Sequence, residues 1–232
     1  RGLARSLMAR GHLKAGYAAL PDGGTDLLLA ELALLGGLPA ETAAALFAER
    51  LRGDAVASAG LVAAFPWWAA QRDTMSLRLA EARADSLERS APASAMLPQA
   101  GYVARSAAAY LSLAREDTAS AIRGLAGLPA HGCPACYLDL VTLAQLLVET
   151  HRDQEAWRIL RAEHTSSSAV PVPTEVLWSL LRGRVAERLG ERERALRAYG
   201  WVAGMWRNAD PGLQPYTAEA REGLARLSRE TS

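Results

Sequence analysis

The sequence is poor in the features that mark several common classes of protein. Only two of its 232 residues are cysteines, which argues against a small scaffold built from disulfides. β-Branched residues are sparse and no segment keeps a polar and apolar alternation, so strands are not expected. The longest apolar stretches fall short of the ~20 residues that a spanning helix needs. The sequence therefore predicts an all-α protein with no membrane span in this segment.

Charge is balanced along the chain. The 26 basic and 25 acidic residues leave a net charge of +1, and neither half is biased toward one sign. Lys14 is the only lysine and Asn208 the only asparagine, which is typical of codon bias in a GC-rich genome. The many arginines are therefore weak grounds for a phosphate-binding surface, and we expect no nucleic acid to contact this segment.

Half of the residues are hydrophobic, which is enough for a substantial core in one domain or in a string of repeated units. The chain begins at Arg1 without methionine, so we expect a fragment, a processed product or an excised domain. Nothing at its amino end resembles a signal sequence. We expect a cytoplasmic location, with an extracytoplasmic segment of a membrane-anchored regulator as the alternative.

Apolar periodicity predicts helices along the whole chain. In the first part they are expected over 2–20, 27–35, 39–52, 55–70 and 75–90, with a break at Pro66. The later part is regular and forms three helix pairs. These pairs are 97–115 with 118–128, 137–150 with 154–163, and 174–189 with 192–206.

The three pairs share a pattern of small and large residues. One small residue in the first helix is followed twelve positions later by alanine, and a large residue comes four positions after that alanine. Small side chains at two matched positions allow the paired helices to approach closely. The matched sets are Ala109, Ala121 and Leu125, then Ala144, Ala156 and Leu160, then Gly183, Ala195 and Tyr199.

The last pair resembles a tetratricopeptide repeat. That pattern has a small residue in the first helix, glycine in the turn, alanine in the second helix and an aromatic residue four positions later. Gly183, Gly190, Ala195 and Tyr199 match it at the right spacings. The resemblance implies a right-handed α-solenoid of antiparallel helix pairs.

The earlier pairs match this pattern less fully. Glu116 and His151 stand where the turn glycine is expected, and leucines replace the aromatic residue. A pair over 65–87 departs further, because bulky Phe65 occupies the small position. We therefore expect 1–92 to be a region of degenerate repeats, 93–209 to hold the repeat pairs, and 210–232 to form a capping helix. The three regions would make one continuous solenoid.

The capping helix has its own start signal. Asp210 is expected as the N-cap and Pro211 as the first helical residue, and Leu213, Leu224 and Leu227 belong to one apolar stripe. A repeat array needs its last apolar face covered, and this helix suits that role.

The resemblance also implies a binding surface, because the first helices of tetratricopeptide pairs line a concave groove. Its mixture of charges would suit a protein or peptide partner. We expect a non-catalytic interaction or sensory scaffold of a bacterial regulatory protein. The groove would expose Tyr110, Gln145, Glu149, Arg184, Glu187 and Arg188.

The segment 181–227 is similar to the carboxyl ends of bacterial signalling proteins in which helical repeats follow a kinase or winged-helix domain. An alternative function is therefore a regulatory segment of a transcription activator or Ser/Thr kinase whose output domain lies upstream. No kinase motif or DNA-reading module occurs in this sequence, so neither catalysis nor DNA binding is predicted for it.

One motif, which contains both cysteines, could form a metal or redox site. Cys133 and Cys136 have the gap that lets two thiolates bind one zinc, and His131 could add a nitrogen. A fourth ligand would have to come from His151, His164 or Asp139, and none has a recognisable spacing. A redox pair is the second possibility, although residues 119–128 before it are expected to be helical rather than extended. A turn with part-buried cysteines, or a local disulfide if the segment is extracytoplasmic, is the third.

Catalytic motifs are otherwise missing from the sequence. It has no nucleophile elbow, zinc-protease motif or phosphate loop, so we expect a protein that is not an enzyme and that needs no cofactor. Its six tryptophans are many for this length, and packing between helices is their expected use rather than a binding surface.

Overall fold

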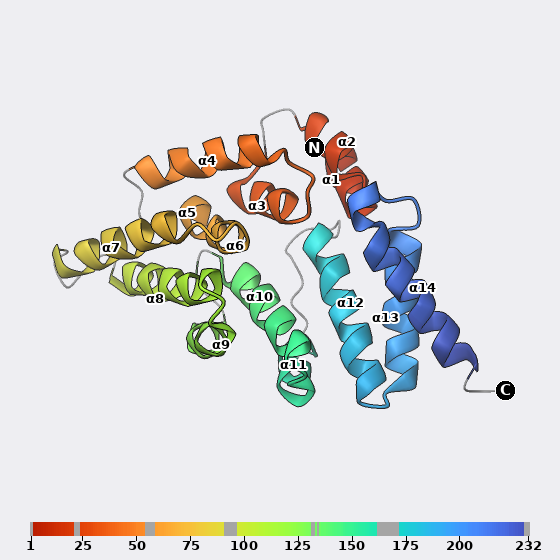
Figure 1. Ribbon diagram of the computed structural model, residues 1–232. Coiled ribbons are helices and arrows are strands. Elements are labelled where there is room, and N and C mark those ends of the chain that lie inside the picture. The colour runs from red at the N-terminus through yellow and green to blue at the C-terminus, as the bar shows by residue number, and fades with distance from the viewer. Residues whose placement is uncertain are drawn as a thin grey trace. The chain divides into compact units, whose positions relative to one another are not determined.

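The computed structural model describes residues 2–20, 24–53, 59–90, 97–130, 133, 135–161 and 172–229. Regular structure in these residues is helical and no strand occurs among them, which confirms the all-α prediction (Figure 1). The helices are α1 (Gly2–Ala9), α2 (Leu13–Ala18), α3 (Asp26–Leu34), α4 (Ala40–Arg52), α5 (Ala59–Ala63), α6 (Phe65–Ala70), α7 (Thr74–Ser90), α8 (Leu97–Ala114), α9 (Thr118–Ala126), α10 (Cys136–Glu149), α11 (Asp153–Leu160), α12 (Pro173–Arg188), α13 (Arg192–Met205), the 3₁₀ turn η1 (Pro211–Leu213) and α14 (Gln214–Arg229).

The chain forms two compact units. One unit comprises residues 1–24, 35–38 and 144–232, and the other comprises residues 25–34 and 39–143. The first contains α1, α2 and α11 to α14, and the second contains α3 to α9. Helix α10 begins in the second unit and ends in the first. The division into three regions at 92 and 209 stays a prediction.

Five helix connections share one C-terminal motif. The residue that ends the turn has a positive φ, and the next residue donates its N–H to the carbonyl five positions earlier, at 2.8 to 3.0 Å. This is the Schellman arrangement, in which a left-handed residue satisfies the last carbonyls of a helix. Three of the five connections thus keep the turn without glycine. The left-handed residues are Gly11 (φ 83°), Arg72 (φ 56°), Glu116 (φ 65°), His151 (φ 56°) and Gly190 (φ 75°).

The small and large residues of the repeat pattern are all buried, as the pattern predicts. In the last pair, a Cβ on Gly183 would lie 2.6 Å from Cε1 of Tyr199. A Cβ on Gly223 of α14 would lie 2.5 Å from Cε2 of the same ring. Tyr199 of α13 therefore packs between glycines of α12 and α14, where no larger residue would fit.

Aromatic side chains form the core of the second unit. Phe47 of α4 lies 5.3 Å from Trp67 and 6.4 Å from Trp68, between ring centroids. Phe65 of α6 lies 5.9 Å from Trp68 and 6.2 Å from Tyr110 of α8. The expected break is present but lies two residues earlier, at Ala64, and Pro66 belongs to the first turn of α6. The rings thus join α4 and α8 through the short helix α6.

The amino end packs within the first unit, where α1 contacts α2 and α12. The single helix expected over 2–20 is wrong, because Gly11 has a φ of 83° and separates α1 from α2. The carbonyl of Gly11 accepts a hydrogen bond from the N–H of Asp210 at 2.9 Å. Residues near the two ends of the sequence are therefore joined by backbone hydrogen bonding.

Asp210 takes the expected N-cap position before Pro211, but the cap bond expected of its side chain is not formed. Pro211 begins the short turn η1 rather than α14. The Asp210 carboxylate instead accepts the N–H of Lys14 at 3.1 Å, in the first turn of α2. It thus satisfies one of the amide groups that every helix start leaves unpaired.

Among the residues that the structure describes, no helix combines the length and the apolar character needed to cross a bilayer.

Candidate functional site

The six predicted groove residues differ in exposure, and Tyr110 lies in the second unit whereas the other five lie in the first. Tyr110 is wrong as a contact residue, because its side chain is fully buried in the second unit. Its hydroxyl donates a hydrogen bond to Oγ1 of Thr142 at 3.0 Å, and its ring packs edge-on against Phe65. The repeat pattern assigns Tyr110 to the right helix, but its neighbours from α6 and α10 cover it.

Arg184 and Glu187 bind the last helix of their own chain. Arg184 forms a two-pronged ion pair with Glu219 of α14, at 2.5 and 2.6 Å. Glu187 accepts hydrogen bonds from Arg226 of α14 at 3.0 and 3.1 Å. These two side chains therefore hold α14 against α12, and their charges are paired within the chain.

The remaining groove residues lie in the first unit. Arg188 pairs with Asp153 at 2.7 Å and donates to the carbonyl of Val148 at 3.1 Å, which joins α12 to the α10–α11 turn. Gln145 is half-buried and Glu149 is exposed. Of the six, Glu149 is thus the side chain that is plainly open to a partner.

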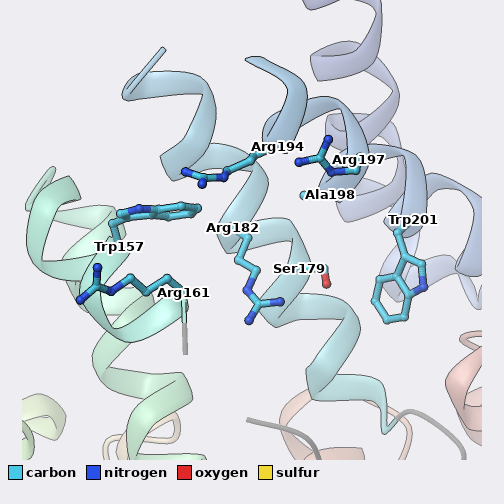
Figure 2. Close-up of a pocket in the computed structure, with 8 residues that line it drawn as sticks. All are labelled: Trp157, Arg161, Ser179, Arg182, Arg194, Arg197, Ala198 and Trp201. Carbon is cyan, nitrogen blue, oxygen red and sulfur yellow. The ribbon is translucent and has the colours of Figure 1, made fainter. Parts of the chain in front are cut away.

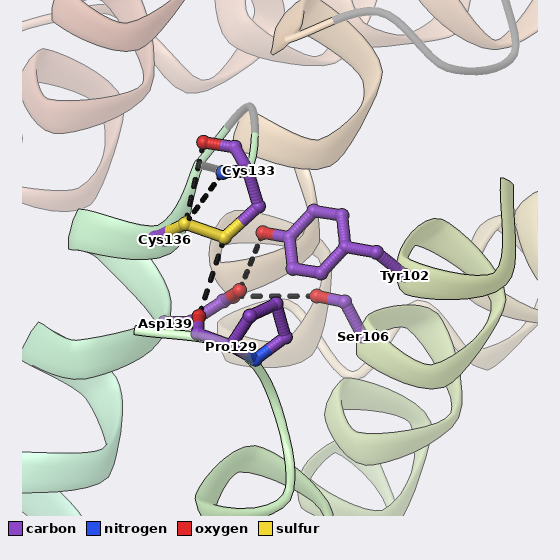
Figure 3. The surroundings of a disulfide bond; sticks show 6 residues. All are labelled: Tyr102, Ser106, Pro129, Cys133, Cys136 and Asp139. Atoms are coloured by element: carbon purple, nitrogen blue, oxygen red, sulfur yellow. Dashed lines mark hydrogen bonds between the residues drawn. A yellow bond between two sulfur atoms is a disulfide. The ribbon is translucent and has the colours of Figure 1, made fainter. Parts of the chain in front are cut away.

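The structure shows how the two cysteines are bonded. Cys133 and Cys136 form a disulfide at the start of α10 (Figure 3). His131 and His164 lie outside the described residues. The part of the chain that the structure describes holds no group of three or more His, Cys, Asp or Glu side chains arranged for a metal ion. Of the arrangements considered from the sequence, the structure therefore contains the local disulfide.

A cluster of buried hydroxyls surrounds Asp139, one helical turn after Cys136. Its carboxylate accepts hydrogen bonds from Tyr102 at 2.6 Å and from Ser106 at 3.2 Å. Burial raises the pKa of Asp139 to about 6, although these hydroxyl donors act to lower it. From the sequence, Asp139 is considered only as a candidate for the fourth ligand of a metal ion. The structure makes it a polar link between α8 and α10, beside the bond from Tyr110 to Thr142.

The first unit contains a pocket of about 610 Å³ that no motif in the sequence indicates. Helices α11, α12 and α13 supply its walls (Figure 2). Four of the eight described residues that line it are arginines and two are tryptophans, and none of the eight carries a carboxylate. They are Trp157, Arg161, Ser179, Arg182, Arg194, Arg197, Ala198 and Trp201.

Helix geometry explains why these side chains gather. On α13, Arg194, Arg197, Ala198 and Trp201 follow the spacing of one helix face. The other face of α13 carries Ala195, Tyr199 and Val202, which pack inward. The amphipathic pattern of α13 thus fixes which face is left to line the pocket.

On α12, Arg182 lies on the opposite side from Arg184, because two residues turn a helix by about 200°. Arg182 therefore faces the pocket while Arg184 faces α14. The Nε of Arg182 donates a hydrogen bond to the carbonyl of Leu160 at 2.6 Å. This bond fixes the guanidinium group between the walls that α11 and α13 provide (Figure 2).

One wall of the pocket is an arginine stacked on an indole. The guanidinium carbon of Arg194 lies 5.5 Å from the ring centroid of Trp157, within the range of a cation–π contact. Arg194 also pairs with Glu191 outside the pocket, at 3.1 Å. Trp157 is half-buried, whereas Trp201 on the far wall is 36% exposed.

The tryptophans therefore divide into two groups. Trp67, Trp68, Trp178 and Trp206 are buried, as expected of packing residues. Trp157 and Trp201 instead line the pocket. The signal in the sequence was the recurrence of arginine and tryptophan on one face of α11 and of α13. This recurrence alone does not indicate a shared site, because only the tertiary structure places the two helices on either side of α12.

No protein-family model matches the chain, and neither the curated proteins nor the solved structures give a significant match. The resemblance to tetratricopeptide repeats stays a prediction.

Proposed function

We propose that the chain is a non-catalytic interaction module whose first unit binds an acidic stretch of a partner protein in the pocket between α11, α12 and α13. The observation that carries this proposal is the lining, which combines four guanidinium groups and two indoles with no carboxylate among its described residues. The wider role would be that of a scaffold within a regulatory protein, built as a solenoid of antiparallel helix pairs.

The charge of the pocket selects an anionic ligand. The chain as a whole is nearly neutral, so four arginines around one cavity are a local concentration of positive charge. Arg161 and Arg197 are exposed at its rim. Guanidinium groups bind carboxylates through paired hydrogen bonds, and the partly desolvated wall strengthens such contacts.

The indoles favour a peptide over a simple anion. Trp201 leaves about a third of its surface in contact with solvent, which is uncommon for so large an apolar side chain unless a partner covers it. A peptide that alternates acidic and apolar residues would place carboxylates on the arginines and apolar side chains on Trp157 and Trp201. The volume suits a few residues rather than a folded surface.

Extended nucleic acid is a poorer fit. A nucleic-acid surface needs positive charge along the path of many phosphates, whereas these arginines surround one cavity in a chain of net charge +1. The pocket also displaces the predicted groove as the binding surface, because Arg184 and Glu187 are already paired with α14.

A labelled short peptide of alternating glutamate and leucine tests the proposal by fluorescence anisotropy, with a glutamine and leucine peptide of the same length beside it. We expect the acidic peptide to bind at least about tenfold more tightly, and to bind more weakly as salt is added. Arg197→Gln and Trp201→Ala should each weaken its binding by about tenfold.

Arg229→Gln is the matched control, because Arg229 is exposed on α14, lies outside the pocket lining and donates a hydrogen bond to the carbonyl of Ala225 in its own helix. Equal binding of the two peptides would contradict the proposal. So would a loss in Arg229→Gln as large as that in Arg197→Gln. A single-stranded oligonucleotide that binds more tightly than the acidic peptide, and that needs Arg197, would assign the pocket to nucleic acid instead.

A further inference from the structure

The disulfide of the second unit joins two sulfurs with different surroundings. Cys133 lies in the turn before α10 and is partly exposed, whereas Cys136 is the first residue of α10 and is 7% exposed. An incoming thiolate must approach along the axis of the bond that it breaks, and Cys133 is the more exposed of the two residues. The accessible side of the bridge is therefore Cys133.

The buried sulfur is placed where a negative charge is stabilised. Sγ of Cys136 accepts the N–H of Cys133 at 3.0 Å, and it stands at the amino end of a fourteen-residue helix. Backbone amides and the helix dipole favour a thiolate at such a position. Cys136 is thus suited to be the leaving group when Cys133 is attacked.

The helix behind the bridge is held in place independently of the sulfurs. Asp139 is 3% exposed and receives hydrogen bonds from Tyr102 and Ser106 of α8 (Figure 3). Opening the bridge would therefore release Cys133 while α10 keeps its contact with α8. A bridge with only a structural role would add little to the free energy of unfolding here, because it closes a loop of very few residues.

We propose that Cys133 and Cys136 form a redox-active pair that exchanges its disulfide with external thiols, with Cys133 as the sulfur that is attacked. A thiolate of the co-reactant bonds to Sγ of Cys133, the bond between the two cysteines breaks, and its electron pair leaves on Cys136, which takes a proton from water. A second thiolate then attacks the co-reactant's sulfur in this mixed disulfide and releases Cys133. The pair gains two electrons and two protons, and two thiols become one disulfide.

The redox chemistry of the two cysteines is independent of the pocket of the first unit. The motif follows α9, whereas the cysteines of a thioredoxin fold follow a strand. The chemistry depends on the two-residue gap, the helix start and the unequal exposure of the sulfurs.

Equilibration of the wild-type chain with mixtures of reduced and oxidised glutathione tests the proposal, with free thiols alkylated and counted by mass spectrometry. We expect both thiols to appear together as the mixture becomes more reducing, because one bond is opened. A bridge that survives a large excess of reduced glutathione, but opens with a phosphine, would be structural and would overturn the proposal. This test needs no variant and so does not depend on how a variant folds.

Single-cysteine variants test which sulfur reacts. With oxidised glutathione, Cys136→Ser should form a mixed disulfide at Cys133 at least about tenfold faster than Cys133→Ser forms one at Cys136, because Cys133 is the more exposed of the two residues. Equal rates in two variants with wild-type helical circular dichroism would contradict the assignment of Cys133. A peptide with two cysteines, compared with glutathione at equal thiol concentration, identifies the faster co-reactant as a protein dithiol or a small thiol.

Discussion

The hydroxyl of Tyr199 donates a hydrogen bond to Glu187 at 2.7 Å, which joins α13 to α12. Glu187 also accepts hydrogen bonds from Arg226 of α14, so its carboxylate connects α12, α13 and α14. Burial acts to raise the pKa of Glu187, but the bonds from Arg226 and Tyr199 outweigh it and leave this pKa lowered. The contact of the Tyr199 ring with Gly183 fixes the spacing that makes the bond possible.

We expect Gly183→Ala to destabilise the first unit by about 1–3 kcal/mol, because the new methyl group would collide with the Tyr199 ring. Gly200→Ala on the exposed side of α13 is the matched control, since a Cβ added there would meet no atom within 4 Å. That change should stabilise by about 0.5–1 kcal/mol. Urea unfolding measures both, and equal effects would show that the close approach of α12 and α13 is not needed.

The alanine positions of the repeat pattern give a second prediction. Ala195 is completely buried, so Ala195→Leu should cost about 1–3 kcal/mol by overpacking the last pair. Glu193, whose side chain is 75% exposed, should tolerate Glu193→Ala with almost no change in the free energy of unfolding. Thermal unfolding followed by circular dichroism compares the two variants. A cost that is the same for both would contradict the alignment of the repeats.

The left-handed residue at the α8–α9 turn gives a third prediction. Glu116 has a φ of 65°, a conformation that costs a residue with a side chain roughly 1–2 kcal/mol. Glu116→Gly should therefore stabilise the second unit, by a net amount of about 0.5–1 kcal/mol because glycine also loosens the unfolded chain. Its ion pair with Arg72 is solvent-exposed, and its loss should matter little.

Glu116→Ala is the control for this change, because it removes the same charge without relieving the left-handed backbone. Its unfolding midpoint in urea should stay close to that of the wild type. A midpoint for Glu116→Gly at or below that of Glu116→Ala would show that the turn is not strained.

The Asp139 carboxyl gives a prediction on pH. Burial raises its pKa from 3.8 to about 6, so the folded chain holds this proton more tightly than the unfolded chain does. The contribution to stability is therefore fully present below about pH 4, and falls as the pH rises from about 4 to about 6. A shift of about two pKa units corresponds to a fall of roughly 3 kcal/mol.

Asp139→Asn removes the titrating proton and keeps an acceptor for Tyr102 and Ser106. The difference in unfolding free energy between wild type and Asp139→Asn should therefore shift in favour of the variant as the pH rises from 4 to 6, and level off above it. Guanidinium unfolding at a series of pH values measures it. A difference that is constant over this range would mean that Asp139 titrates normally.

The sequence by itself determined the helices and most of their ends. The predicted pairs agree with α8 to α13 to within a few residues, because apolar spacing, short polar turns and the break before Pro66 act over a few neighbouring positions. The burial of the matched positions, such as Ala195 and Tyr199, followed from the same local periodicity. These features need no knowledge of which helices are neighbours.

Only the tertiary structure decided what the polar and aromatic side chains do. Tyr110 is covered by residues from other helices, and Asp210 serves α2 rather than the helix that follows it. The pocket exists because α11 and α13 present Trp157 and Trp201 on either side of α12. Such outcomes depend on contacts between segments far apart in the chain. Helical periodicity tells which face of a helix is buried, but not which partner covers it.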